Sequence, residues 1–424
     1  MTSALSLSAL LRKPVTDEHG HRIGVLADVI VRLRHGDYPL VTGLVVAVGS
    51  TSRVLVFMSA AHLAELTPER IHLRVSTGDM GEFQRREGEV LLREDVLGHR
   101  LIDLSRVTLV KAYDVQLTQV PDGWAVTGLD VHRRRWLGLG PRHAAHSPRD
   151  WLDFEPLIGH AQSARVRRAG GRLPELKPAQ IADILEDATD EEQDELLAQV
   201  HQDPDLEADV FEELDPDSQT ELLRDRPDAH VAEVLARMQA DDAADALMDL
   251  PQERRMPVLS QLPEPQRTNV YRLLSYHDLT AGGLMGTEFI ALPATATAAD
   301  ALASVHAAKT LQPQALIMLY TLTPEGTLDG ALSLPQVIQA DPASRLGAIA
   351  DAHVIVASPT DDVVDITTRM ADFNLLALPV VSEDRHILGV ITVDDALEAA
   401  IPPDWTRRET DHHGTEPPRT SKQP

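Results

Sequence analysis

Three aspartates crowd the start of one short helix expected in the middle of the chain. The stretch DDAADALMD, residues 241–249, places Asp241, Asp242 and Asp245 within little more than one helical turn. Two carboxylates about 4 Å apart at a protein surface repel each other by up to roughly 4 kcal/mol, so a divalent cation between this helix and carboxylates of another domain would relieve the repulsion. Mg²⁺ suits such a site, because it prefers oxygen ligands, keeps several waters and needs only one or two carboxylates. A second interpretation stays open, in which Asp241 or Asp242 only caps the helix or interacts with its dipole.

The rest of the sequence gives little support for catalysis. The absence of cysteine excludes disulfides and thiolate metal sites and suits a reducing compartment. The 18 histidines form no HExxH pattern, and the chain has neither a GxSxG motif nor a Walker phosphate loop. We therefore expect a protein that is not an enzyme.

Charge is unevenly distributed along the chain. The net charge is −27, and residues 173–262 alone hold 26 acidic against 6 basic side chains. An excess of this sign disfavours nucleic-acid binding and favours cations. Residues 131–172 are instead rich in arginine, and their segment RVRRAGGR is either a contact for phosphate or an anionic membrane surface, or a solvated linker.

Residues 173–280 have the pattern of short helices. PAQIADILEDA begins with a proline suited to the first helical position and places Ile181, Ile184 and Leu185 on one face. Proline or aspartate interrupts the pattern about every 10 to 15 residues. Because such short helices are unstable alone, neighbouring helices must cover their Leu and Val faces. The expected result is an acidic superhelix of short helical hairpins.

The first 140 residues predict β-structure built twice. DVIVRL at 28–33 returns as DVQLTQV 86 positions later, and VTGLVV at 41–46 returns as VTGLDV 85 positions later. The stretch resembles two tandem PRC-barrel domains, small β-barrels used for docking, over residues 1–72 and 88–140. We interpret Asp28 and Asp114 as strand-start or turn residues that bind no ligand. The resemblance rests on Asp17, Gly20, Ile23, Gly24, Asp28, Gly43 and Leu44 in the first copy and on Asp114, Gly128 and Leu129 in the second.

The motif YHDLTAGGLMG, residues 276–286, ends the helical region. Here the chain resembles the cytosolic N-terminal domain of the MgtE magnesium transporters and its junction with the following domain. We expect Gly282 and Gly283 to let the chain leave a helix through a backbone conformation closed to other residues. The matching residues are DDAADAL at 241–247, Leu273, Leu274, Tyr276, Ala281, Gly282, Leu284 and Met285.

Two further αβ repeats follow the junction, with equivalent turns TPEGTLDG and SEDRHILG. They resemble a pair of cystathionine-β-synthase (CBS) domains, which hold the same place in MgtE transporters, at 281–340 and 341–401. The expected fold is multidomain α+β: two small β-barrels, a basic linker at 141–172, an all-α superhelix at 173–280 and an α/β CBS-domain pair. Residues 402–424 predict a disordered tail, and no run approaches the roughly 18 apolar residues of a membrane span, so we expect no pore domain.

The resemblance to MgtE implies that magnesium binds between the helical domain and the CBS pair and holds them together. It extends the candidate ligands from the helix to the second CBS domain. CBS pairs usually associate face to face, so the resemblance also implies a homodimer. The candidate metal ligands are Asp241, Asp242, Asp245, Asp372, Asp394, Asp395 and Glu398.

A nucleotide cleft is the second candidate site. CBS domains that bind adenosine ligands often carry GxxTxxD, which GVITVDD matches with Thr392 for a phosphate and Asp395 for ribose hydroxyls. Phe373 is placed to stack on an adenine, so ATP or AMP is a candidate ligand. In the alternative interpretation Thr392 caps a helix and Phe373 belongs to the core.

These features favour a soluble, cytoplasmic magnesium-sensing regulatory protein related to MgtE transporters. Mg²⁺ would bias the helical domain toward docking on the CBS pair. The PRC-like barrels would contact a membrane transporter or the inner face of the membrane. Two alternatives stay open: an adenine-nucleotide sensor without metal dependence, and a docking scaffold that has lost ion sensing.

Overall fold

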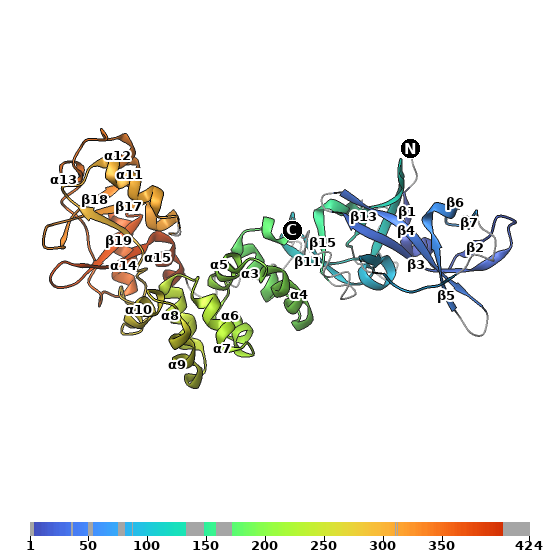
Figure 1. The fold of residues 1–424 in the computed structure, drawn as a ribbon, viewed down its shortest axis with the longest axis horizontal. Helices are drawn as coiled ribbons and strands as arrows, with labels where there is room; N and C mark the ends of the chain where they lie inside the picture. The colour runs from blue at the N-terminus through green and yellow to red at the C-terminus, as the bar shows by residue number, and fades with distance from the viewer. Residues whose placement is uncertain are drawn as a thin grey trace, which may run out of the picture. The chain divides into compact units, whose positions relative to one another are not determined.

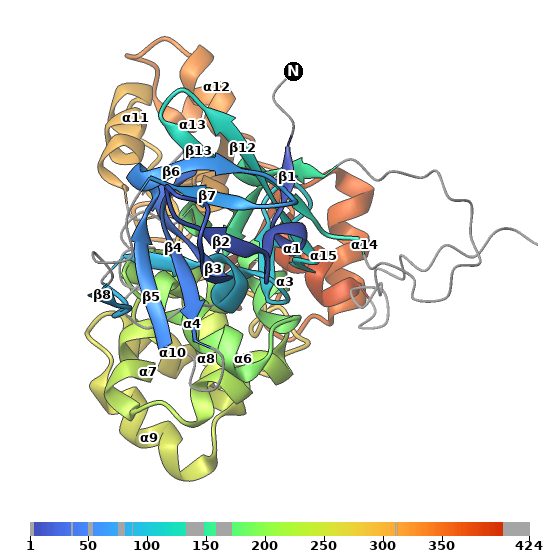
Figure 2. The same ribbon diagram turned by 90° about the vertical axis from the view of Figure 1, so that its right-hand side faces the viewer.

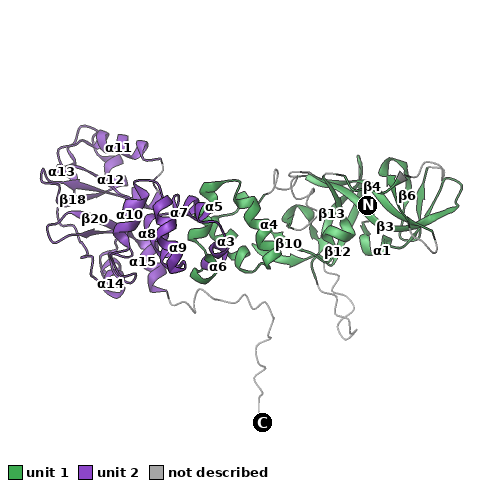
Figure 3. Ribbon diagram, turned by 60° about the horizontal axis from the view of Figure 1, so that its bottom comes forward, with its two compact units in different colours: residues 1–219 green, residues 220–424 purple. Residues whose placement is uncertain are grey.

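The chain forms two compact units, residues 1–219 and 220–424 (Figure 3). The expected tail at 402–424 and most of the expected basic linker lie outside the residues that the structure describes. The computed structural model describes residues 4–34, 37–49, 54–74, 81–86, 88–132, 148–157, 172–309, 311 and 313–401.

The strands of the two sequence repeats form one sheet in the first unit. Hairpin β3–β4 (Arg22–Arg34 and Asp37–Val48) and hairpin β12–β13 (Asp114–Val120 and Gly123–Asp130) are joined where β13 pairs with β4. Figure 2 shows β3, β4 and β5 side by side, as their pairing requires. The other strands of this sheet are β1 (Leu5–Ser6), β2 (Pro14–Thr16), β5 (Val54–Ser59), β6 (Leu63–Leu66), β7 (Ile71–Leu73), β8 (Gly81–Glu82), β9 (Glu89–Leu91) and β14 (Arg149–Asp150).

Backbone geometry confirms the internal repeat. Arg12 and Gly98, 86 positions apart, both have positive φ, 65° and 87°. Their amides donate to equivalent carbonyls, those of Leu26 and Ala112. Each of these positions follows a short helical turn, α1 (Leu7–Leu10) or the π-helix η3 (Leu92–Val96). Two strands of a separate small sheet, β10 (Arg100–Asp103) and β11 (Thr108–Lys111), then lead into β12.

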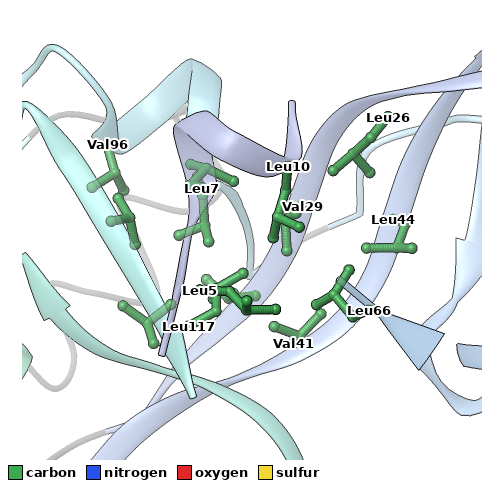
Figure 4. Packing of buried hydrophobic residues seen from close by; sticks show 14 of the residues in the cluster. Leu5, Leu7, Leu10, Leu26, Val29, Val41, Leu44, Leu66, Val96 and Leu117 are labelled. Carbon is green, nitrogen blue, oxygen red and sulfur yellow. The ribbon is translucent and has the colours of Figure 1, made fainter. Parts of the chain in front are cut away.

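Both repeats contribute to one hydrophobic core. Leu5, Leu7 and Leu10 from the N-terminus pack with Val29 and Leu44 of the first hairpin and with Val96 and Leu117 of the second repeat (Figure 4). The buried Trp151 and Phe154 join the same core.

Residues 148–157 correct the expected extent of the linker. Within this stretch β14 pairs with β13, and β15 (Phe154–Pro156) pairs with β10. Its apolar side chains and ladder hydrogen bonds show that it is not a linker. It belongs to the strand-rich part of the first unit, the described residues between 4 and 157, which we call the β unit.

The expected series of short helices is present between the β unit and the CBS region. Proline occupies the first position of α3, α5 and α6, where its missing N–H has no helical partner to lose. Thr189 and Glu192 form a capping box at the start of α4. The helices are α3 (Pro178–Glu186), α4 (Asp190–Val200), α5 (Pro204–Glu212), α6 (Pro216–Arg224), α7 (Asp228–Leu235), α8 (Ala240–Asp249), α9 (Gln252–Gln261) and α10 (Gln266–Leu273).

The CBS region consists of two similar αβ halves, seen around β17–β19 in Figure 1. In the first half β16 pairs parallel with β17 and β17 pairs antiparallel with β18, while in the second half β19 pairs antiparallel with β20. In the described part of the chain, every helix is too short or too polar to cross a membrane. The elements are β16 (Ile290–Pro293), α11 (Ala298–Ala307), β17 (Met318–Leu322), β18 (Leu328–Ser333), α12 (Leu334–Gln339), α13 (Leu346–Ile349), α14 (Val363–Phe373), β19 (Ala377–Val381), β20 (Ile387–Thr392) and α15 (Val393–Ala400).

The junction after α10 runs along the second half of the CBS region, not the first. The amide of Ala281 donates to Asp361, and Gly286 and Val390 exchange backbone hydrogen bonds. The expectation for Gly282 and Gly283 is wrong, because neither has positive φ. A Cβ on Gly282 would instead lie 2.4 Å from the ring of Tyr276. The glycine is needed for close packing, and the junction ties the helices to the start of α14 and to β20.

Candidate functional site

One face of α8 carries three aspartates, which differ in their surroundings. Asp241, in the first turn, is buried, whereas Asp245 and Asp249 lie exposed on the following turns. The carboxylate of Asp241 faces the junction: a Cβ built on Gly286 would lie 3.7 Å from its Oδ2 atom. The helix therefore meets the segment that leads into the CBS region through its acidic face.

Asp245 is the centre of a crowded set of carboxylates. Burial of its surroundings raises its pKa to about 7, and the negative charges of Asp278, Asp249 and Glu398 raise it further in that order. The side chain itself stays accessible to solvent, so an ion or a proton can reach it. We call Asp245, Asp249, Asp278 and Glu398 the acidic cluster.

Three elements supply the acidic cluster. Asp245 and Asp249 lie on α8, Asp278 lies in the junction after α10, and Glu398 lies on α15. Figure 1 shows α8, α10 and α15 in the same part of the second unit. The junction pairs with β20, which leads directly into α15, and both Asp278 and Glu398 act electrostatically on Asp245.

The chemistry of the acidic cluster fits a hard divalent cation. All its groups are carboxylates, which are preferred ligands of Mg²⁺, and the site is open enough for the waters that this ion retains. Among the described residues, no hydrogen-bond donor contacts the Asp245 carboxylate. Either a proton or a cation would therefore stabilise it.

The structure brings together only part of the predicted metal set. Asp245 and Glu398 are within electrostatic reach of each other. Asp242 lies half-buried in the first turn of α8. Asp372 is exposed near the end of α14 and Asp394 at the start of α15. Neither Asp372 nor Asp394 is among the groups that raise the pKa of Asp245.

Two members of the acidic cluster were missing from the predicted set. Asp249 lies four positions after Asp245 on the same helix, so its helical spacing was a usable signal. Asp278 lies in the junction motif, and no local pattern marks it. Its place in the site follows from the fold alone.

Thr392 and Asp395 form a capping box at the start of α15. The Asp395 carboxylate accepts the amide of Thr392 at 3.1 Å and its hydroxyl at 2.6 Å. Burial raises the pKa of Asp395, against the opposing effect of these hydrogen bonds. Ser333 and Gln336 form the equivalent box at the start of α12. This geometry supports the interpretation of Thr392 as a helix cap.

Phe373 lies on the surface, whereas the alternative interpretation placed it in the core. Its side chain is 57% exposed at the end of α14, so its assignment to the core is wrong. The next residue, Asn374, ends the helix in the left-handed conformation. An exposed aromatic ring on this helix is free to stack on a planar ligand.

Family comparisons identify two regions of the chain. Residues 176–278 match the MgtE intracellular N domain, and residues 346–402 match the CBS domain. Helices α3–α10, Asp278 at the start of the junction, and α15 lie in these regions, which therefore contain the whole acidic cluster.

The curated relatives are bacterial transporters. The chain is 30% identical to the magnesium transporter MgtE of Thermus thermophilus over 194 residues, 45% of this chain and 43% of that protein. It is 23% identical to the MgtE of Bacillus subtilis over 240 residues, 57% of this chain and 52% of that protein. The chain thus spans about half the length of these relatives, which are transporters rather than enzymes.

Solved structures show the same likeness over the helical and CBS regions. The soluble part of a magnesium transporter is 26% identical with a TM-score of 0.52, covering 56% of this chain and 93% of that chain. The cytosolic domain of the Mg²⁺ channel MgtE in complex with ATP is 28% identical with a TM-score of 0.51 and has the same coverage. The β unit lies outside the family matches, which begin at residue 176.

Proposed function

We propose that this chain, which carries an MgtE intracellular N domain followed by a CBS domain, is a magnesium-sensing regulatory protein that responds to Mg²⁺ through the acidic cluster. Mg²⁺ would lie between α8, the junction and α15. The observation that carries the proposal is Asp245, whose pKa is raised to about 7 by burial and by three neighbouring carboxylates. Named relatives of the chain are magnesium transporters.

The response follows from electrostatics. Without a cation, negative charges of the N domain and the CBS region repel one another across the acidic cluster. A divalent ion that binds the closed arrangement better than an open one shifts the population toward the closed one. Because Asp278 follows α10 and Glu398 belongs to α15, this shift would change how α8 sits on the second half of the CBS region. Such a change is the signal available to a partner.

The test compares Mg²⁺ with sodium on the full chain. Limited proteolysis and thermal melting are followed in MgCl₂, in chelator and in NaCl of equal ionic strength. We expect millimolar Mg²⁺ to raise the melting temperature and protect the junction, since a ligand that binds only the folded state stabilises it. Asp245→Asn with Glu398→Gln should remove the difference between the salts. Asp384→Asn, an exposed aspartate in the turn before β20, is the matched control and should keep it.

Equal protection by the two salts would refute the magnesium proposal. It would favour the scaffold alternative, in which the architecture is kept without ion sensing. Full Mg²⁺ protection in the double variant would place the ion elsewhere, for example around Asp241 and Asp242.

Assembly and placement are part of the same proposal. The chain would form a homodimer through its CBS region and act in the cytoplasm, with the β unit docking on a transporter or on the inner membrane surface. Sedimentation analysis tests the dimer, and flotation with anionic vesicles tests the membrane contact. The proposal covers sensing and leaves ion translocation to the partner.

A second candidate ligand is an adenine nucleotide. The related MgtE cytosolic domain was solved with ATP, and the ring of Phe373 is exposed on α14. Calorimetry with ATP, ADP and AMP at saturating Mg²⁺ tests this. Phe373→Ala should weaken nucleotide binding by about 1–3 kcal/mol if the ring stacks on the base. Asp395→Ala removes the capping box with Thr392 and shows whether nucleotide binding depends on it. Undiminished affinity in Phe373→Ala would remove the ring from the site.

A further inference from the structure

A pocket opens in the β unit at the place where the two repeats meet. It has a volume of about 340 Å³ and includes residues from the first hairpin, from β5 and from η3. At about 30 Å³ for each water-sized group, this volume accommodates on the order of ten non-hydrogen atoms. Its lining residues are Ala27, Asp28, Val45, Leu55, Phe83, Leu91, Arg93 and Glu94.

The lining divides into apolar walls and a small polar part. Val45 and Leu91 are buried, Leu55 is exposed, and Phe83 is half-buried. Pockets that bind small molecules commonly combine such walls with one or two oriented polar groups. The polar group farthest from solvent here is Asp28, which is 5% exposed.

Asp28 caps a helical turn that comes from the other repeat. Its Oδ1 atom accepts the amides of Val29 at 2.7 Å and Arg93 at 2.8 Å. Among the residues that the structure describes, its Oδ2 atom accepts the amide of Glu94 alone, at 3.1 Å. Burial raises the pKa of Asp28 to about 6 despite these three hydrogen bonds. The carboxylate therefore has unused acceptor capacity in a place with little water.

The internal repeat supplies a matched reference for this carboxylate. Asp114, 86 positions later, likewise accepts two amides through Oδ1, from Val115 at 2.9 Å and Ser8 at 3.0 Å. Its Oδ2 atom, however, receives two hydroxyl groups, those of Ser6 and Ser8. The corresponding places at Asp28, 85 or 86 positions after these serines, are held by Leu91, Leu92, Arg93 and Glu94.

The comparison with Asp114 shows that, among the described residues, amides donate to the Asp28 carboxylate but hydroxyls do not. At Asp114 two serine hydroxyls of the chain donate to Oδ2, whereas Asp28 lines a pocket instead. The pocket lining contains two carboxylates, those of Asp28 and Glu94, and one guanidinium, that of Arg93, which donates to the carbonyl of Ala27 at 3.4 Å. The local balance of charge favours a cation over an anion, and the apolar walls favour one with a hydrocarbon body.

We propose that this pocket binds a small organic ammonium ion, with its N–H groups donating to Asp28 and its apolar body against Val45, Leu55 and Phe83. The proposal assigns a ligand site to the β unit, beyond the interpretation of Asp28 as a purely structural residue. It is independent of magnesium sensing. A primary ammonium supplies three donors, as the serines supply two hydroxyls at Asp114.

The probe for this site is 2-phenylethylammonium, whose number of non-hydrogen atoms matches the volume of the pocket. It is titrated into the full chain by calorimetry and by ligand-observed NMR, beside the neutral 2-phenylethanol and the hydrocarbon ethylbenzene. We expect saturable binding of the ammonium at millimolar concentration or below. The alcohol should bind about fivefold more weakly or worse, since hydrogen bonds to charged groups are stronger than neutral ones.

Three variants test the placement of the probe. Ala27→Leu places a larger apolar side chain in the pocket lining, keeps the Asp28 carboxylate, and should abolish binding. Asp28→Asn should weaken binding about tenfold or more by removing the charge. Asp114→Asn is the matched control, because its carboxylate is already completed by hydroxyls, and should leave the affinity unchanged.

The result that overturns the proposal is equally specific. Absence of saturable binding, or equal affinity for ethylbenzene and the ammonium, rejects an ammonium site. Unchanged binding in Ala27→Leu rejects this pocket, and this variant decides the question if Asp28→Asn fails to fold. Circular dichroism and melting of each variant establish that it is folded.

Discussion

Asp245 should make the closed arrangement of the second unit depend on pH. Its pKa in the folded chain is about 7, against an ordinary value of 3.8. The folded state thus holds the Asp245 proton more tightly than the unfolded state does. The stabilising effect of the proton is fully present below the ordinary value and is lost as pH rises through the folded value of about 7.

The pKa shift of Asp245 sets an upper limit on this change in stability. A shift of one pKa unit corresponds to 1.36 kcal/mol, so the full shift sets an upper limit of about 4 kcal/mol. More than a third of the Asp245 side chain is exposed, and solvent screening reduces this limit to roughly 1–2 kcal/mol. We therefore expect chelator-treated protein to lose about that much local stability at α8 between pH 5.5 and 8.5.

Mg²⁺ should reverse this loss, because the ion and the proton compete for the same carboxylate. Its apparent affinity should fall by up to about tenfold for each pH unit below 7. Hydrogen exchange of the α8 and junction amides is the assay, since it reports local opening rather than global unfolding. Salt is kept constant, because exposed charges are screened.

Variants separate Asp245 from the rest of the acidic surface. Asp245→Asn should flatten the pH dependence of hydrogen exchange in α8. In chelator at pH 8.5, the α8 amides of this variant should be more protected from exchange than those of the unmodified chain. Asp384→Asn should change neither. A profile in the unmodified chain that is flat across this range, or one that Asp245→Asn leaves intact, would show that repulsion at the acidic cluster does not control the arrangement.

Three further predictions concern packing and ion pairs. Gly282→Ala should lower the stability of the second unit by about 1–3 kcal/mol in thermal melting, because its Cβ meets the Tyr276 ring at 2.4 Å; Gly286→Ala, whose nearest neighbours lie at 3.7 Å, should cost far less, and equal losses would count against close packing as the reason for the glycine. Asp103→Asn should destabilise the β unit by about 3–5 kcal/mol in denaturant titrations, since Asp103 is fully buried and paired with Arg149. Burial alone would raise the pKa of Asp103, but the hydrogen bonds from Arg149 and Ser105 outweigh it and lower the pKa. The unmodified β unit should therefore lose stability as pH falls below about 4. The same loss of stability at low pH in Asp103→Asn would contradict this assignment. Tyr320→Phe should leave the melting temperature unchanged or raise it, because the Tyr320 hydroxyl is buried with no partner among the described residues; a clear loss would indicate a bound water or ligand.

The sequence predicts elements well where a local signal exists. Prolines at first helical positions, repeated strand words 86 positions apart and the Thr392–Asp395 spacing all correspond to observed caps or hairpins. These features depend on neighbouring residues in the chain. The multidomain α+β class follows from them.

Long-range placement is where sequence reasoning fell short. Nothing local shows that the junction pairs with the second half of the CBS region, so Asp278 could not be assigned to the site. The need for Gly282 was attributed to backbone freedom, because the approach of the Tyr276 ring is visible only in three dimensions. Likewise, residues 148–157 lack a strong strand pattern, and their tertiary pairing with β13 and β10 makes them strands.

The acidic residues of this chain also show how a structural carboxylate differs from a responsive one. Asp114 is held by two amides and two hydroxyls. Its charge has fixed donors, so a change in ion concentration gives it little to gain. Asp245 has three carboxylates around it and no hydrogen-bond donor among the described residues. Because its stabilising partner must come from solution, its surroundings can respond to what the solution contains.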